Sequence, residues 1–154
     1  MKKTLSILLF LAISFGSYAQ TDGDYVEIMR SVLKTEKKAT VAEAMQLTDT
    51  ESAPFWALYK EYNDQVYLAQ NKRIKAIKDY ADHYEDLSDE KADEIWMLVL
   101  KYQQETLKLE KKYYKKFKKI LPTGKAVRYF QVESKIDALI SAQLALEIPL
   151  VETK

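Results

Sequence analysis

The stretch IWMLVLKYQQETLKLEKKYYKKFKKI, residues 95–120, decides the fold class. Its large apolar side chains recur every three or four residues, a spacing that places them in one stripe along an α-helix. The stripe contains Ile95, Leu98, Val99, Tyr102, Leu109, Tyr113, Phe117 and Ile120. The pattern predicts a helix from about Asp89 to Ile120, which would extend about 50 Å at about 1.5 Å per residue.

The preceding segment predicts a second long helix. An apolar stripe runs through residues 55–66 and resumes over residues 74–84, with Gln70 and Asn71 between the two halves. Amides on an apolar stripe cost stability unless they are hydrogen-bonded. Three interpretations stay open for this pair: a bend, a hydrogen bond that sets the register, or a stretch open to solvent.

Two shorter helices complete the prediction, one over about residues 24–46 and one after the break at residues 121–124. The 3 glycines and 3 prolines are too few for the many turns of a sheet protein. The predicted fold class is therefore all-α: a long antiparallel helical hairpin with two shorter flanking helices, forming a thin bundle. A single helical domain is expected over residues 20–146. An extended tail is expected over residues 147–154, because Pro149 disfavours helix before it.

The N-terminus resembles a cleavable signal peptide. Lys2 and Lys3 precede an apolar run at residues 5–15, and the small residues Ser17 and Ala19 follow where a signal peptidase reads them. Residues 1–19 are thus predicted to be removed, and the protein to be exported to the periplasm. The alternative, a membrane anchor, needs roughly 20 consecutive apolar residues, and the run is shorter than that.

Composition narrows the function classes. The charge of the full chain is +1, and it falls to about −1 once Lys2 and Lys3 are removed, since 22 basic residues then stand beside 23 acidic ones. That balance argues against nucleic acid as a partner. Cysteine is absent, so no disulfide supports the fold and packing must do so. No segment after the signal peptide is apolar enough for stable membrane insertion.

A degenerate repeat, LTDTESAPFW at residues 47–56 and LSDEKADEIW at residues 87–96, opens the two long helices. Thr48 and Ser88 are predicted N-caps, and Glu51 occupies the reciprocal position of a capping box in the first copy. The positions given a structural role are Leu47, Thr48, Trp56, Leu87, Ser88 and Trp96.

Two further expectations come from the repeat. Pro54 lies so deep in the first copy that two alternatives are expected: an irregular first turn, or a regular helix that begins nearer Ser52, two to four residues later than Thr48 implies. Trp56 and Trp96 stand at the same offset from their caps, and both are interpreted as buried anchors. The alternative is that these rings are partly exposed and contact a partner.

Three motifs together resemble the Spy/CpxP family of periplasmic stress proteins. They are the L-[ST]-x-x-x openings of two helices, the run FWALYKEY at residues 55–62, and LPTGKAVRYFQVE at residues 121–133. The family motif usually has glutamine as its fifth residue, whereas Glu51 and Lys91 stand there in this chain.

The resemblance implies a helical hairpin wrapped by shorter helices, often as a cradle-shaped homodimer. It implies an ATP-independent chaperone that binds unfolded or partly folded envelope proteins. The resemblance also implies two other roles: a regulatory accessory of an envelope stress sensor or, with less support, a metal-responsive periplasmic protein.

A basic stretch near the end of the helix at 89–120 offers a surface for such binding. The predicted contact residues are Lys108, Lys112, Lys115, Lys119 and Tyr114. Charge attracts a client chain over distance, and adjacent apolar area retains it. The alternative is a solvated helix face whose lysine stems lie along the edge of the core.

Metal binding and catalysis have little support in the sequence. His83 is the single histidine, and with Asp79, Asp82 or Asp86 it is a minor candidate for a metal site. The chain has no thiol and no glycine-rich phosphate loop. No enzyme activity, cofactor or bound metal is therefore predicted.

Overall fold

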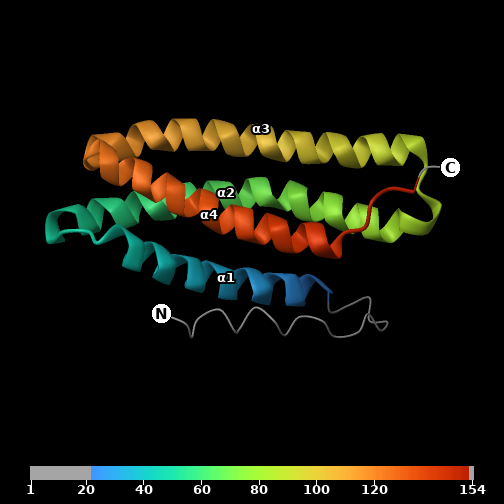
Figure 1. Cartoon of the computed structure of the whole chain (residues 1–154), viewed down its shortest axis with the longest axis horizontal. Helices are drawn as coiled ribbons and strands as arrows, with labels where there is room; N and C mark the ends of the chain where they lie inside the picture. The colour runs from blue at the N-terminus through green and yellow to red at the C-terminus, as the bar shows by residue number, and fades with distance from the viewer. Residues whose placement is uncertain (1–21, 153–154) are drawn as a thin grey trace. The chain divides into compact units, whose positions relative to one another are not determined.

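The structure is a computed structural model that describes residues 22–152, shown in Figure 1. The predicted signal peptide lies outside the described residues. The elements are α1 (Asp22–Met45), α2 (Asp49–His83), the short 3-10 helix η1 (Tyr84–Asp86), α3 (Asp89–Ile120) and α4 (Thr123–Glu147). Within residues 22–152 every regular element is helical, which confirms the predicted all-α fold.

The chain divides within α1, between Lys38 and Ala39, into two compact units. The second unit contains the end of α1 and all of α2, α3 and α4. In this unit α2 and α3 pack along each other as an antiparallel hairpin closed by η1, and α4 packs against α3 (Figure 1). The predicted hairpin is confirmed, and α3 has the bounds that its apolar stripe predicted.

The start of α2 differs from the prediction. The helix begins at Asp49, directly after Thr48, so the expectation of a later start was wrong. Pro54 lies inside the helix, where it cannot donate a hydrogen bond to the carbonyl group of Thr50. Both residues are exposed, so water can reach that carbonyl group. The proline is tolerated because its cost falls on a solvated face.

Each copy of the repeat caps its helix through a different atom pair. In the first copy the Thr48 N–H donates to Glu51 Oε2 at 2.9 Å. In the second copy the Lys91 N–H donates to Ser88 Oγ at 3.2 Å. Glu51 also accepts a hydrogen bond from Lys125 of α4. The Lys125 ammonium and then the Thr48 N–H lower the pKa of the Glu51 carboxyl, so this group stays ionised at neutral pH.

The end of α1 is held by the start of α4. Gln46 follows the helix in the left-handed region, with φ of 44°, which turns the chain toward α2. Lys125 Nζ donates to the Gln46 carbonyl group at 3.3 Å, and Arg128 Nε donates to the Ala44 carbonyl group at 2.7 Å. Cations near a helix C-terminus are favourable because the last carbonyl groups have no intrahelical partner.

The main core is a cluster of aromatic rings where the end of α1, the start of α2, the end of α3 and the start of α4 meet. The Phe117 and Tyr129 rings are 4.5 Å apart, and Phe55 lies 5.5 Å from Phe117 and 5.3 Å from Tyr129. The buried members are Val41, Met45, Phe55, Tyr59, Tyr62, Val66, Tyr113, Phe117, Leu121, Ala126 and Tyr129. Such rings supply large buried area and edge contacts.

A smaller cluster lies near the hairpin turn and consists of Ala76, Tyr80 and Ile95. Leu87 packs against it, as Leu47 packs against the main cluster, so the leucines of the two repeat copies have equivalent places. Beyond Glu147 the chain has no regular secondary structure as far as residue 152. Tyr80 Oη donates to the Pro149 carbonyl group at 3.2 Å, which ties this tail to α2.

The two tryptophans differ, which corrects one prediction. Trp56 is half-buried, and its ring meets Phe55 at 5.0 Å and Tyr59 at 5.1 Å. Trp96 is 58% exposed, so its interpretation as a buried anchor was wrong. Because the two tryptophans lie equally far from their N-caps, their side chains point in similar directions from the helix axes. Their neighbours in the folded chain nevertheless differ. Trp56 lies beside the main cluster, whereas Trp96 follows Ile95 on the outer side of α3.

Candidate protein-binding surface

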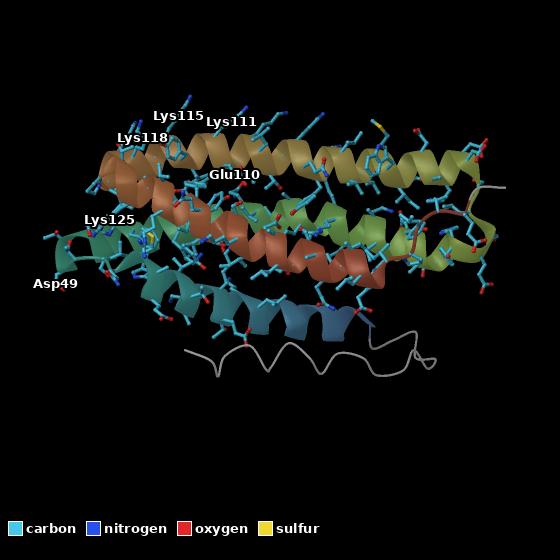
Figure 2. The ribbon with its side chains drawn as sticks, viewed as in Figure 1. Asp49, Glu110, Lys111, Lys115, Lys118 and Lys125 are labelled. Carbon is cyan, nitrogen blue, oxygen red and sulfur yellow. The ribbon has the colours of Figure 1, made fainter. Side chains whose placement is uncertain are left out.

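Lysines cover the outer side of α3, opposite the buried Ile95, Tyr102, Tyr113 and Phe117. We call this set the lysine face; it comprises Lys101, Lys108, Lys111, Lys112, Lys115, Lys118 and Lys119, all exposed. Figure 2 shows Lys111, Lys115 and Lys118 pointing away from α2 and α4. All four predicted contact lysines belong to it.

The acids of this part of α3 lie elsewhere. Glu105 is turned to α2, where its Oε2 accepts from Lys72 Nζ at 2.7 Å. Glu110 is half-buried and close to carboxylates of α4. The lysine face consequently contains no acidic side chain of α3, on a chain whose total charge is nearly zero.

An open hollow lies between α2 and α3, with a volume of about 320 Å³. Its lining consists of Gln65, Leu68, Ala69, Lys72, Glu105, Lys108, Leu109 and Lys112. Leu68 is 56% exposed, so an apolar side chain stands at the surface beside Lys108 and Lys112. Sequence reasoning missed Leu68, which lies off the apolar stripe of α2. A large apolar residue out of phase with that stripe was the available signal.

The hollow also bears on the amides of α2. The helix continues without interruption through Gln70 and Asn71, with Gln70 half-buried and Asn71 exposed. The lining of the hollow includes Ala69 and Lys72 on either side of the two amides, but neither amide itself. The unbroken helix excludes an interruption at this pair.

Tyr114, one of the predicted contact residues, does not line the hollow. Its half-buried ring meets the Phe130 ring of α4 edge-on at 5.7 Å, and Lys118 Nζ lies 5.5 Å from the centre of the Tyr114 ring. It therefore contributes to the packing of α4. Lys108 and Lys112 line the hollow, whereas Lys115 and Lys119 continue the exposed row toward the end of α3.

Polar contacts between side chains also hold α2 and α3 in register. Tyr113 Oη donates to Glu61 Oε1 at 2.9 Å, and Lys116 Nζ donates to the same oxygen at 2.7 Å. Burial, followed by the bond to Glu61, raises the pKa of Tyr113 to about 12. The Lys116 ammonium and the Tyr113 hydroxyl lower the pKa of Glu61. Lys116 is thus committed to an internal ion pair, unlike the lysines of the face.

Acidic groups cluster where α4 crosses α3. Burial raises the pKa of Glu110, and the nearby Asp137 and Glu133 raise it further. Arg73 of α2 offsets part of this charge, with Nη1 3.4 Å from Asp137 Oδ1 and its guanidinium 5.6 Å from the centre of the Tyr102 ring. Glu133 is a carboxylate on the apolar stripe of α4, and its approach to Glu110 depends on where α4 crosses α3.

Replacing Glu110 with glutamine is expected to stabilise the fold at neutral pH by less than about 1 kcal/mol. An acid whose pKa is raised by folding binds its proton more tightly in the folded chain, so its ionisation above the unfolded pKa costs stability. The gain from the substitution should therefore shrink as the pH falls through the range in which Glu110 takes up its proton. Thermal unfolding of both chains across pH tests this, and a lower midpoint for Glu110→Gln at pH 7 would contradict it.

His83 is held by the helix backbone. Its Nδ1 lies 2.8 Å from the Asp79 carbonyl oxygen, and the Asp79 carboxylate pairs with Lys75 at 2.5 Å. Among residues 22–152, no group of three or more histidine, aspartate or glutamate side chains is arranged to hold a metal ion. The minor prediction of a metal site on His83 with Asp79, Asp82 or Asp86 is therefore not supported by the geometry.

Comparison with protein-family models, curated proteins and solved structures finds no match for this chain. The resemblance to the Spy/CpxP family consequently rests on the sequence motifs alone and stays a prediction. In the part of the chain described, none of the helices has both the length and the apolar character needed to cross a membrane.

Proposed function

We propose that this protein is an exported, ATP-independent chaperone-like protein that binds unfolded or partly folded envelope proteins. The observation that carries the proposal is the hollow between α2 and α3, where the exposed Leu68 stands beside Lys108 and Lys112. Lys115 and Lys119 extend the same positive surface along α3.

The chemistry of this surface suits weak binding to many chains. The lysines carry flexible point charges, so they attract acidic segments without demanding a fixed geometry. Leu68 offers apolar area that an unfolded client can cover with its own exposed apolar side chains. An open hollow admits different side chains in turn, whereas an enclosed pocket would select one ligand.

Charge reversal in the hollow tests the proposal. The double variant Lys108→Glu and Lys112→Glu should bind an acidic denatured client about tenfold more weakly, which corresponds to about 1.4 kcal/mol. The matched control is Lys78→Glu with Lys135→Glu, which makes the same charge change outside the hollow. Light scattering of several unrelated denatured proteins, mixed with near-equal concentrations of each variant, measures the protection.

The outcomes separate the proposal from its alternatives. Protection of most clients by the native chain, lost in the hollow variant and kept in the control, supports the chaperone. Protection that is equal in both variants removes the hollow from the function. Failure of the native chain to protect any client, together with capture of a single envelope protein, would instead indicate the regulatory accessory of a stress sensor.

A further inference from the structure

The second part of α4, residues 133–147, lies outside the core, and we call it the strap. The buried side chains of α4, Ala126 and Tyr129, both precede it, and none of the side chains over residues 133–147 is buried. Half-buried side chains at steps of three and four residues mark its inner face. They are Glu133, Ile136, Ile140 and Leu144.

The two core clusters hold the ends of the strap. Just before its start, the Phe130 ring packs against the main cluster, and just after its end Ile148 packs against the smaller cluster near the hairpin turn. Between these points Leu139 is 70% exposed and Leu146 is 82% exposed. A segment with so little buried apolar area can open locally at a small cost in free energy.

Carboxylates from two helices meet where the strap crosses α3. Glu110 of α3 lies close to Glu133 and Asp137 of the strap. From α2, Arg73 Nη1 lies 3.4 Å from Asp137 Oδ1, and Arg73 Nη2 donates to Ser141 Oγ at 3.2 Å. When all three acids are ionised, they outnumber the cation that α2 contributes, so repulsion acts between the strap and α3.

Glu110 is the group whose protonation changes this balance. Burial raises its pKa, and Asp137 and Glu133 raise it further. The Tyr62 hydroxyl of α2 also faces these carboxylates. Because folding raises its pKa, Glu110 gives up its proton only as the pH rises above the ordinary range of glutamate, and that loss weakens the folded arrangement. In acid, the protonated carboxyl can instead donate a hydrogen bond to a carboxylate of the strap.

We propose that the strap is a pH-dependent cover, which lies closed on α2 and α3 in mildly acidic solution and lifts as the pH rises to neutral. Arg73 is its latch, since the guanidinium holds Asp137 and Ser141 while lying 5.6 Å from the centre of the Tyr102 ring. Lifting breaks these contacts and brings the inner face of the strap into water.

The inference goes beyond the proposed function. Arg73, Glu110 and Asp137 do not line the hollow between α2 and α3. Opening of the strap is also measured without a client, so the two proposals stand or fall separately.

Thiol accessibility measures the opening, because the chain has no cysteine of its own. Ile140→Cys places a thiol on the inner face, and Leu139→Cys places one on the exposed face as a matched control. The ratio of their reaction rates with a maleimide cancels the effect of pH on thiol ionisation. From about pH 5 to about pH 7.5 the ratio of the inner to the outer rate should rise at least about threefold.

Charge variants, each combined with both cysteine substitutions in turn, test whether Glu110 is responsible. Glu110→Gln removes the titrating group, so the ratio should stay low at both pH values. Glu105→Gln is its matched control, since this acid of α3 pairs with Lys72 of α2, and the rise should remain. Arg73→Gln should raise the ratio at both pH values, because it removes the cation that offsets the carboxylates.

A ratio that is the same at both pH values in the otherwise native chain would overturn the proposal, and so would a rise that persists with Glu110→Gln. Circular dichroism at each pH establishes that the variants are helical. If Ile140→Cys does not fold, the half-buried Leu144→Cys and the exposed Leu146→Cys provide a second pair for the same measurement.

Discussion

Replacing Phe117 with alanine is expected to lower the free energy of unfolding by about 3 to 5 kcal/mol. The ring is fully buried and lies 4.5 Å from Tyr129, 5.5 Å from Phe55 and 5.8 Å from Phe130. Three helices meet at this point, so no single side chain can move to fill the cavity. Urea unfolding followed by circular dichroism measures the loss.

The matched control for this substitution is Leu107→Ala in the same helix. Leu107 is 49% exposed, so its truncation should cost less than about 1 kcal/mol. Equal losses at the two positions would show that the aromatic cluster is not the principal core.

The tryptophans should respond unequally to truncation. Trp56→Ala is expected to cost about 2 to 3 kcal/mol, because it removes two edge contacts with Phe55 and Tyr59 as well as half-buried area. Trp96→Ala should cost less than about 1 kcal/mol, since that ring is mostly exposed. Thermal unfolding of both variants beside the native chain compares the two losses.

A result in the opposite order would contradict the packing described for the two repeat copies. The same pair of variants therefore distinguishes a ring that packs against the core from a ring that is exposed on α3.

Local rules predicted most of the fold. The bounds of α3 follow from its single apolar stripe, from the Ser88 cap and from the break at Leu121 and Pro122, all of which depend on neighbours in sequence. The start of α2 was misplaced because the cost of Pro54 depends on whether water reaches the carbonyl group of Thr50. Exposure of that kind is a property of the folded chain.

The candidate surfaces were predicted less completely, for a physical reason. The lysines could be assigned from composition, since charged side chains at the end of a helix are usually solvated. The hollow beside Leu68 depends on how far apart α2 and α3 stand, and the place of Tyr114 depends on where α4 crosses. The spacing of apolar residues within one helix predicts neither the separation of α2 and α3 nor the place where α4 crosses.

The unequal distribution of aromatic rings along the hairpin has a dynamic consequence. The fully buried rings gather near one end, while the cluster near the turn at η1 has Ala76, Tyr80 and Ile95 as its buried members, with partly buried apolar side chains around them. Local opening should therefore begin at the turn and proceed inward, with the ring-filled end the last to exchange its amide protons.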